Sequence, residues 1–338
     1  MKLSVALCTY NGEKFLRQQL DSIAGQALLP DELVVCDDRS RDSTVSILEE
    51  FSKQAPFPVH IFQNETNLGS TKNFERAISL CNGEIIALCD QDDVWKTHKL
   101  QRITDEFRVH PEAGYVFSDA ELVNAQRQSL GKRLWDSIGF HKEIRHNFVG
   151  DKQLRCFAKQ HIVTGATMAF RASVGQMAMP FPTIGNFIHD GWIALVASAM
   201  GSYGVPIEEP LIEYRQHSRQ QIGAPEAPQA IKKRKSLLSM YRDLKINQEI
   251  LLSGWEANCL RFLVLKDILE KLEERCPTDA LRRNLIYFQA FETHYRNRKK
   301  ILTTKDLKRY RLIFQEAFSG RYSRFADSWR SIFRDLFL

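Results

Sequence analysis

Four short apolar runs near the start of the chain have the pattern of buried strands. Each is nearly continuous and bounded by polar residues, and they span 3–9, 32–37, 59–64 and 84–90. The segments between them carry apolar side chains three or four positions apart, as amphipathic helices do, and span 13–26, 41–54 and 70–83. Strands and helices that alternate at these lengths predict an α/β domain with a mostly parallel sheet and helices on both faces.

The alternation becomes looser beyond residue 113. The pattern there predicts a strand, an irregular connection, a second strand, a helix and an extended segment, at 114–122, 130–150, 163–171, 189–201 and 203–217. The end of the chain is helical in pattern, with helices expected at 231–252, 257–274, 279–300 and 307–318. We therefore predict an α/β domain at 1–225, followed by a helical region at 226–338.

Charge is unevenly divided between these two regions. The whole chain has a net charge of +6, but residues 231–338 hold 24 Lys and Arg against 13 Asp and Glu, a balance of +11. The first 230 residues balance at −5. The basic helices are either ordinary solvated helix faces or a surface attracted to anionic lipid headgroups.

The composition of the chain bears on the cellular compartment in which the protein works. No apolar run reaches the roughly 18 residues that a membrane span needs, and the start of the chain lacks the pattern of a secretory signal. The seven cysteines include no C-x-x-C pair, which favours reduced, packed side chains over disulfides or a zinc site. We expect a cytoplasmic protein.

Polar residues follow each of the first four predicted strands, at the sheet edge where such folds bind ligands. These stretches read TYN, DDRS, NETNLGSTK and DQDD. Neither a G-x-G-x-x-G after the first strand nor a G-K-[ST] loop occurs, so the usual dinucleotide and P-loop fingerprints are absent.

Three aspartates, Asp90, Asp92 and Asp93, directly follow the fourth strand. Like charges at the end of a buried strand repel one another and are costly to desolvate, and a hard divalent cation relieves both problems. The alternative is that one aspartate caps the next helix while the others are solvated. Asp37 and Asp38 end the second strand similarly, where they would bind metal, accept hydrogen bonds from a base or ribose, or cap a helix.

Four stretches resemble, in order and spacing, the N-terminal motifs of family 2 glycosyltransferases. They read VALCTYNGEKFLRQQLDSI, DELVVCDDRSRDST, NLGSTKNFERAI and GEIIALCDQDDVW. The resemblance is strong over residues 1–95, looser through TGATMAFR, HDGW and EYRQH to about residue 223, and absent from the helical tail. It implies the GT-A nucleotide-sugar-binding fold, which is Rossmann-like, and transfer of a sugar from a nucleotide diphosphate donor.

The resemblance also implies which residues contact the donor. They are Thr9, Tyr10, Asn11, Asp37, Asp38, Lys72, Asp90, Gln91, Gly165, Thr167 and Arg215. Asp37 would support the loop that holds the nucleoside, and Arg215 would meet the leaving phosphates. Lys72 stands where members of the family often have Arg, and a lysine neutralises diphosphate without binding it bidentately. Gly165 and Thr167 would line the sugar pocket.

The same resemblance implies a metal and a general base. Asp90 and Asp92 form the D-x-D that would bind Mg²⁺ or Mn²⁺, and His217 stands where some metal-dependent members supply a late ligand. Asp190, in HDGW, matches the general base of inverting members, and a carboxylate at a helix start is suited to deprotonating an acceptor hydroxyl. The alternatives are a helix cap for Asp190 and a surface position for His217.

The stretch from HDGW to EYRQH is most similar to bacterial rhamnosyltransferases of the family, which implies a dTDP-rhamnose donor. The expected acceptor is a glycan or lipid-linked glycan in cell-surface polysaccharide synthesis, with peripheral contact to an anionic membrane. The sequence leaves the oligomeric state open.

Other classes of protein fit the sequence less well. A nucleic-acid-binding protein would use the basic tail, but the tail has no recognition motif and acidic strand ends repel phosphates, so no nucleic acid partner is expected. A sugar-nucleotide pyrophosphorylase needs a Gly-rich basic loop where this chain has TYNGEKFL. In dehalogenase-like phosphatases the second Asp of D-x-D typically precedes Thr by two positions, whereas Val94 stands here. A glycoside hydrolase needs neither cation nor nucleotide loop.

Overall fold

The structure, a computed structural model, divides into two compact units, Met1–Pro228 and Gln229–Leu338. It describes residues 1–150, 152–159, 162–182, 188–218, 220, 223, 248–304, 307–325, 331–332 and 335–336. The division predicted from the sequence, into an α/β catalytic domain at 1–225 and a basic helical region at 226–338, stays a prediction.

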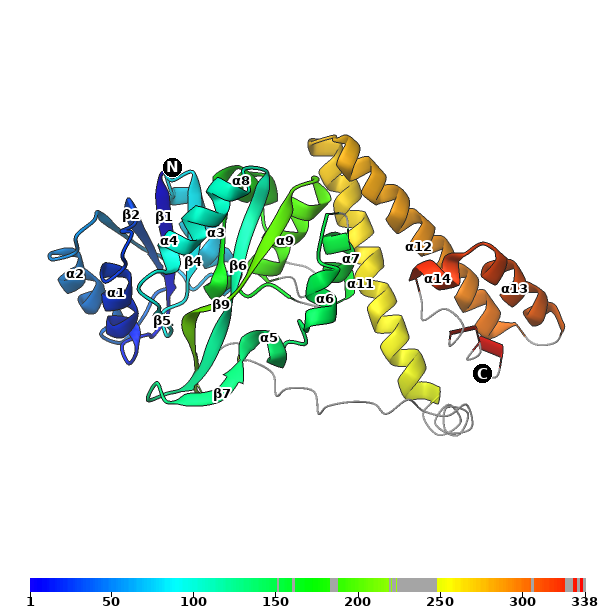
Figure 1. The fold of residues 1–338 in the computed structure, drawn as a ribbon, viewed down its shortest axis with the longest axis horizontal. Helices are drawn as coiled ribbons and strands as arrows, with labels where there is room; N and C mark the ends of the chain where they lie inside the picture. The colour runs from blue at the N-terminus through cyan, green and yellow to red at the C-terminus, as the bar shows by residue number, and fades with distance from the viewer. Residues whose placement is uncertain are drawn as a thin grey trace. The chain divides into compact units, whose positions relative to one another are not determined.

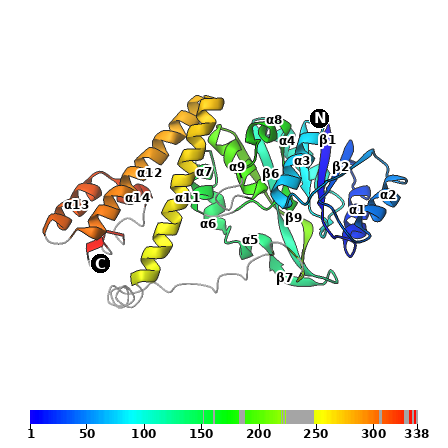
Figure 2. The same cartoon turned by 180° about the vertical axis from the view of Figure 1, so that it is seen from behind.

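A nine-stranded sheet forms the centre of the first unit (Figures 1 and 2). Its main path runs β3-β2-β1-β4-β8-β6-β9-β5, and β7 pairs with β6. The first four strands pair in parallel and are β1 (Leu3–Thr9), β2 (Glu32–Asp37), β3 (Val59–Gln63) and β4 (Ile85–Cys89). The others are β5 (Val94–Trp95), β6 (Ala113–Asn124), β7 (Ser129–Arg133), β8 (Met168–Arg171) and β9 (Tyr203–Gln216).

Helices cover both faces of this sheet. One face carries α1 (Leu16–Ala24), α2 (Thr44–Ser52) and α4 (Lys99–Val109). The other carries α3 (Ser70–Leu80), α8 (Ala172–Ala178) and α9 (His189–Ala199). Shorter elements are α5 (Leu134–Ser137), α6 (Lys142–His146), α7 (Lys152–Lys159) and the 3₁₀ turn η1 (Gly165–Thr167). The predicted α/β fold, with a mostly parallel first half of the sheet, is confirmed.

The apolar periodicity explains how the first helix packs. Leu16, Leu20 and Ile23 share one face of α1, and all three are fully buried. They join Val5 and Leu7 of β1 in one core cluster, because alternate residues of a strand point to the same face of the sheet. This packing holds α1 against the face of the sheet beside β1.

Three local predictions were wrong. The connection at 130–150, predicted to be irregular, contains β7, α5 and α6. The strand predicted at 163–171 forms only over β8, since residues 165–167 turn tightly as η1. The helix expected directly after DQDD begins at Lys99, because Val94 and Trp95 first pair with β9. No aspartate of DQDD therefore caps that helix.

The strand order creates a crevice at one edge of the sheet. Because β1 lies between β2 and β4, successive strands are added to one side of β1 and then to the other. Thr9 is in register with Asp37, and Leu7 with Cys89, so the ends of all three strands meet at one edge. Such a reversal of strand order is where open α/β sheets bind ligands.

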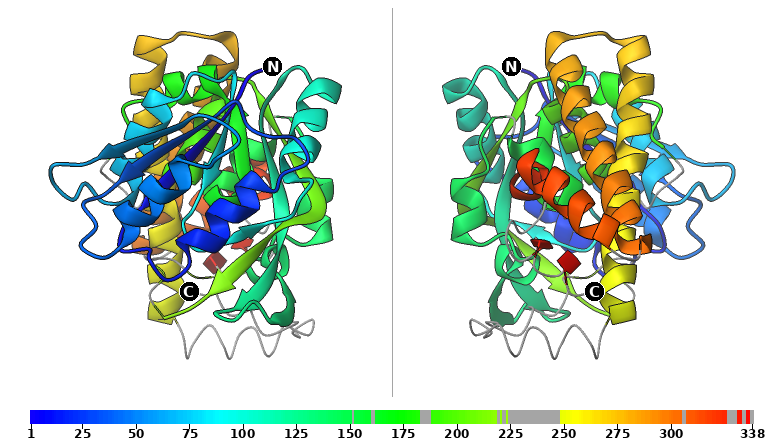
Figure 3. Two further views of the ribbon diagram at one scale, coloured as in Figure 1. Left: turned by 90° about the vertical axis from the view of Figure 1, so that its left-hand side faces the viewer. Right: turned by 90° about the vertical axis from the view of Figure 1, so that its right-hand side faces the viewer.

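The second unit is helical. Its helices are α11 (Gln248–Arg275), α12 (Asp279–Thr303), α13 (Leu307–Phe318) and α14 (Arg321–Phe325). Figure 3 shows α11 and α12 side by side, and Phe262 of α11 stacks on Phe291 of α12 with ring centroids 4.0 Å apart. Most of the helix predicted at 231–252 lies outside the described residues. Within the ranges that the structure describes, no helix is both long and apolar enough to cross a membrane.

Buried charge pairs hold the short helices of this unit together. Glu316 of α13 is 1% exposed and accepts hydrogen bonds from His294 of α12 (2.6 Å) and from both Nε and Nη2 of Arg321 (2.7 Å each). Burial raises the pKa of Glu316, but these hydrogen bonds and one from Asn297 outweigh it and lower the pKa to about 2. The ionised carboxylate is therefore the form that stabilises the fold.

We predict that Glu316→Gln destabilises the second unit at neutral pH by about 2 kcal/mol, because hydrogen bonds to a buried carboxylate are weakened and Arg321 loses its counter-charge. A carboxyl with a depressed pKa stabilises above its unfolded value and loses that effect as pH falls toward its folded value. The difference between the wild type and the variant should thus shrink as the pH is lowered from about 5 to about 3. Urea unfolding followed by circular dichroism measures it; equal midpoints at neutral pH would contradict the role of Glu316.

Candidate active site

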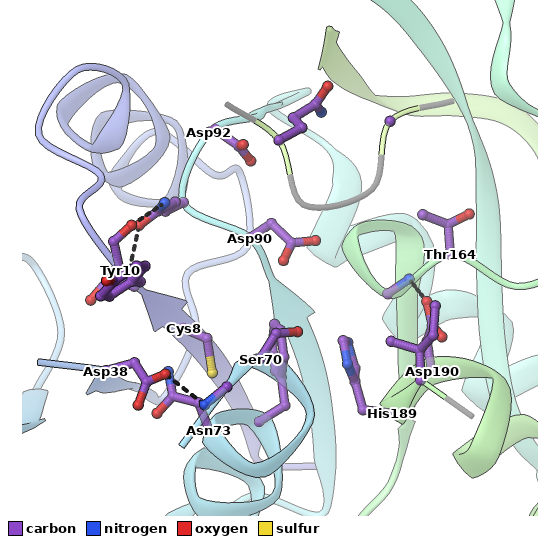
Figure 4. A pocket seen from close by; sticks show the side chains of 18 of the residues that line it. Cys8, Tyr10, Asp38, Ser70, Asn73, Asp90, Asp92, Thr164, His189 and Asp190 are labelled. Atoms are coloured by element: carbon purple, nitrogen blue, oxygen red, sulfur yellow. Dashed lines mark hydrogen bonds between the residues drawn. The ribbon is translucent and has the colours of Figure 1, made fainter. Parts of the chain in front are cut away.

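A cavity of about 730 Å³ opens at the ends of β1, β2 and β4. Figure 4 shows Tyr10 and Asp38 on one side of it, Thr164 and Asp190 on the other, and Asp90 and His189 between them. Its lining comes from the strand ends, from the first turn of α3, and from the segments around α5, η1 and the start of α9. Residues far apart in the sequence thus share one site.

Asp37 organises the loop after β2. Its carboxylate accepts hydrogen bonds from the Thr9 hydroxyl (2.8 Å) and from the hydroxyl and backbone N–H of Ser40 (2.5 and 2.8 Å). Asn11, in a left-handed conformation with φ of 49°, accepts a hydrogen bond from the Arg41 N–H through its side chain at 2.9 Å. Asp37 and Asn11 therefore join the loops after β1 and β2.

Asp38 orders the loop that precedes α3. One of its oxygens accepts from the Asn64 side chain and from the Leu68 N–H, both at 2.7 Å, and the other accepts from the Gly69 N–H at 2.9 Å. Gly69 has φ of 78°, which glycine adopts without the strain of a side chain. Gly69 and Ser70 consequently bring the N-terminal turn of α3 to the cavity wall.

Gln91 fastens the loop after β1 to the loop after β4. Its side chain accepts from the Tyr10 N–H at 2.8 Å and donates to the Tyr10 carbonyl at 3.0 Å. The Gln91 amide occupies the space beside Gly12, where an added Cβ would lie 2.2 Å from its oxygen. Tyr10 is 48% exposed and lines the cavity, so its aromatic ring is available to a ligand there.

The aspartates after β4 carry an excess of negative charge. Desolvation, followed by the charges of Asp92 and Asp190, raises the pKa of Asp90 to about 7. Desolvation, Asp92 and Asp90 likewise raise the pKa of Asp93 well above its usual range. Without a further cation, this cluster holds its charge at a cost in free energy.

Lys99 is one of two buried basic side chains that partly offset the negative charge of these aspartates. Lys99 is fully buried, lies 3.8 Å from the Trp95 ring centroid, and donates to the Ala166 carbonyl at 2.7 Å. Desolvation lowers the pKa of Lys99 to about 7, although Cys89, Asp93 and Asp90 oppose that shift. Lys99 thereby links the loop after β4, residues 90–93, to the η1 turn on the far side of the cavity. We call residues 90–93 the aspartate loop.

Arg215, at the end of β9, is 1% exposed and holds the aspartate loop in place. Its guanidinium donates to the carbonyls of Asp92 (2.6 Å) and Ala125 (2.7 Å) and to the Gln18 side chain (2.7 Å), and its backbone N–H donates to Asp93 (2.9 Å). Its contacts position the loop rather than line the cavity. The contact with leaving phosphates expected of Arg215 stays a prediction.

His217 reaches the aspartate loop from the other side. Its Nε2 lies 2.8 Å from an oxygen of Asp92, and its ring packs on Phe15 with centroids 4.7 Å apart. Asp90, from the same loop, lines the cavity. Among the described residues, no group of three or more His, Cys, Asp or Glu side chains is arranged to hold a metal ion. Metal binding by Asp90, Asp92 and His217 therefore stays a prediction.

Asp190 forms the opposite wall, at the start of α9. One oxygen accepts from the Gly165 N–H at 2.7 Å and the other from the Gly191 N–H at 2.5 Å. The neighbouring His189 ring stacks on Phe74 of α3, with centroids 4.0 Å apart. A Cβ at Gly165 would lie 2.8 Å from His189 Nε2, so the close approach of η1 to α9 requires glycine there.

The sequence-predicted residues divide by position. Those that line the cavity are Thr9, Tyr10, Asp38, Asp90, Gln91, Asp92, Gly165 and Asp190, and those that do not are Asn11, Asp37, Lys72, Thr167, Arg215 and His217. The Lys72 ammonium contacts Glu75 (2.5 Å) and the Phe181 carbonyl (2.9 Å), and the Thr167 hydroxyl donates to the Thr164 carbonyl (2.8 Å). The binding roles predicted for the residues that line the cavity, and for those that do not, stay predictions.

Sequence reasoning missed several residues at the site. Ser70 and Asn73 reach the cavity from α3, and Leu134 and Ile138 reach it from the segment at 130–150 that was predicted to be irregular. The helix start after NETNLG was a usable signal for Ser70, since helix N-termini favour anions. Lys99 carried no such signal, because a lysine at the start of an amphipathic helix is ordinarily exposed.

Comparison with known proteins identifies the class. Residues 4–174 match the model of glycosyl transferase family 2, which is half of this chain, so the chain belongs to that family. The family and the enzyme class predicted from the sequence, glycosyltransferase, are confirmed. The crystal structure of residues 1–349 of S. aureus TarS with UDP-GlcNAc has a TM-score of 0.52 at 17% identity, covering 99% of this chain and 91% of that one. That likeness shows the GT-A fold.

Curated relatives match parts of the chain. An uncharacterized glycosyltransferase, alr2836 of Nostoc sp., is 26% identical over 219 residues, which are 64% of this chain and 65% of that protein. The dTDP-rhamnosyl transferase RfbG of Shigella flexneri is 36% identical over 103 residues, which are 29% of this chain and 36% of RfbG. The chain thus spans less than two thirds of the length of either relative.

We predict that Asp90→Asn makes the ligand-free protein more stable at about pH 8, with Tm higher by roughly 3–6 °C. A carboxyl with a raised pKa destabilises the fold increasingly as pH rises from its unfolded value to its folded value of about 7. The gain in Tm should therefore disappear as the pH is lowered toward about 4.5. Thermal unfolding in EDTA measures this; a gain that is the same at both pH values would show that Asp90 carries no such charge penalty.

Proposed function

We propose that this chain is an inverting glycosyltransferase that moves a sugar from a nucleotide diphosphate donor to a hydroxyl group of an acceptor. The observation that supports this most is the cavity of about 730 Å³, with an acidic strand end on one side and Asp190 on the other. Its volume suits a nucleotide sugar, and its walls combine an anion-binding helix start, acidic residues and a candidate base.

In this proposal the donor lies along the strand ends. The exposed Tyr10 ring offers a stacking face for the base, while Thr9 and Asp38 line the nucleoside end. The diphosphate would meet the first turn of α3 at Gly69 and Ser70, because the N–H groups and dipole at a helix start favour anions.

The chemistry of the aspartate loop suits Mg²⁺ or Mn²⁺. Carboxylates of Asp90 and Asp92 and the imidazole of His217 would hold the ion together with donor phosphate oxygens. The raised pKa of Asp90 supports this choice, since it reflects negative charge that the residues of the loop do not fully neutralise. When bound, the ion would offset the charge that develops on the departing diphosphate.

Asp190 is the proposed general base. The Gly165 and Gly191 N–H groups fix both carboxylate oxygens at the cavity wall. Asp190 takes the proton of the acceptor hydroxyl, whose oxygen forms a bond to the anomeric carbon. The bond from that carbon to the diphosphate oxygen breaks, its electron pair leaves with the diphosphate, and the anomeric configuration inverts.

We propose dTDP-rhamnose as the donor. The similarity to RfbG supports this, as do the apolar side chains of Leu134, Ile138 and Ile188 at the cavity, which suit the methyl group of a 6-deoxy sugar. The proposed acceptor is a glycan or lipid-linked glycan in cell-surface polysaccharide synthesis. The enzyme would then act in the cytoplasm, at the inner face of the membrane.

Thermal-shift measurements with dTDP, UDP and GDP, each with and without Mn²⁺, test donor binding. We expect dTDP with Mn²⁺ to stabilise the protein most, by about 2–3 kcal/mol at a hundredfold excess over Kd. Stabilisation by UDP or by GDP, with none by dTDP, would contradict the proposed donor. No stabilisation by any nucleotide would contradict the whole proposal.

We predict that Asp190→Asn leaves dTDP binding within about twofold of wild type and lowers the transfer rate by about 100- to 10,000-fold, because the base is lost while the donor site stays intact. Asp21→Asn, at an exposed carboxylate of α1, is the matched control and should change neither quantity. Calorimetry and a transfer assay measure the two effects. Loss of donor binding in Asp190→Asn would argue against its role as base.

A further inference from the structure

Helix α13 exposes an apolar stripe on the second unit. Leu307, Phe314 and Phe318 are 83%, 58% and 89% exposed, and Tyr310 is 46% exposed. At 3.6 residues per turn, the first three lie within about 40° of one another around the helix, with Tyr310 on one flank. Among the described residues, Phe318 and Leu307 are the two most exposed large apolar side chains.

The stripe takes no part in the core of its own unit. The opposite side of α13 is the packed one, where Ile313 and Glu316 are each 1% exposed and Glu316 binds His294 and Arg321. The helix would therefore fold and pack without the exposed aromatic side chains. Several adjacent exposed apolar residues of this kind mark a binding surface.

The described charged residues that border the stripe on α13 are positive. Lys308 and Arg311 are exposed on its other flank, and the one acidic residue of α13, Glu316, is buried on the far side. Long basic side chains can lie along an apolar surface and present their charge at its border. The stripe and its flank together form a basic, amphipathic face, which we call the α13 face: Leu307, Lys308, Tyr310, Arg311, Phe314 and Phe318.

The charge of the α13 face selects its occupant. Two copies of this chain that met through this face would bring basic residues together with no acidic partner, so the face does not complement itself. An anionic bilayer complements both the charge and the apolar surface of this face. Its phosphates suit Lys308 and Arg311, and the boundary between headgroups and acyl chains suits the aromatic side chains. The +11 balance of residues 231–338 adds attraction of the same sign.

We propose that the α13 face docks on the surface of an anionic membrane. Phe314, Phe318 and Leu307 enter the boundary between headgroups and acyl chains, and Lys308 and Arg311 contact lipid phosphates. This contact depends on the second unit alone and does not require the proposed sugar donor. It would bring the enzyme to the surface where a lipid-linked acceptor lies.

Co-sedimentation of the full chain with vesicles tests the proposal. We expect binding to phosphatidylcholine vesicles that contain about one third phosphatidylglycerol, and at least tenfold weaker binding to phosphatidylcholine alone. Phe314→Ser with Phe318→Ser, and separately Lys308→Gln with Arg311→Gln, should each weaken binding about tenfold. Val109→Ser removes a 70% exposed apolar side chain from the first unit and should leave binding unchanged.

The two paired variants keep the test decisive. Circular dichroism checks that each is folded, and the charge pair alone suffices if the aromatic pair fails that check. The proposal would be overturned if the wild type bound equally well to vesicles with and without phosphatidylglycerol. It would also be overturned if neither paired variant weakened binding. Sedimentation velocity covers the other occupant: a wild-type dimer that Phe314→Ser with Phe318→Ser converts to monomer, without vesicle binding, would assign the face to a second copy and also overturn it.

Discussion

The crowding of carboxylates at the end of β4 is the constraint on which the site depends. The buried strand β4 is followed directly by Asp90, Asp92 and Asp93. The charge of Asp190 lies close enough to help raise the pKa of Asp90. Such a group persists only if the surrounding structure holds it in place. The Arg215 guanidinium donates to the Asp92 carbonyl of the loop, and Lys99 places beside the loop a buried amine whose pKa desolvation lowers to about 7. The loop is thus rigid yet short of positive charge, which is the state that a metal-bound diphosphate would relieve.

The fold explains why the residues proposed to bind the donor and the proposed base lie on different walls. The proposed donor side is built by β1, β2, β4 and the start of α3, which the parallel half of the sheet brings to one edge. The proposed base side is built by η1, which directly precedes β8, and by α9, which follows it, and β8 is the strand that pairs antiparallel with β4. A hydrogen bond from Gly165 to Asp190 joins η1 to α9, and one from Lys99 of α4 to Ala166 ties η1 to the core of the sheet. We therefore expect mutations to separate donor binding from proton removal.

The sequence predicted the local part of this arrangement well. Strands β1 and β2 and helix α13 begin and end at the predicted residues, because their apolar periods are unbroken and their ends are marked by polar residues. Strand ends in a parallel sheet meet by topology, so Thr9, Asp38 and Asp90 were predictable as neighbours. Contacts that depend on packing between distant segments were not. Nothing in the local pattern around Lys99 or Arg215 distinguishes a buried, loop-holding cation from a solvated one.

The same limit applies to the turn at 165–167 and to the segment before it. A strand pattern at 163–171 gave way to η1, since the Gly165 N–H bonds to Asp190, a residue of a different element. The residues around α5 were predicted to be irregular, yet Leu134 and Ile138 form part of the cavity wall. Their apolar side chains are held there by tertiary packing, which no short window of sequence contains.

The central claim is that the aspartate loop and His217 hold a divalent ion together with a donor diphosphate. The most direct measurement is the anomalous diffraction of crystals grown with Mn²⁺ and dTDP. A single manganese peak bounded by Asp92, His217 and both phosphates, and lost in Asp92→Asn, is the result expected. Bound dTDP with no manganese near Asp92 would contradict the claim.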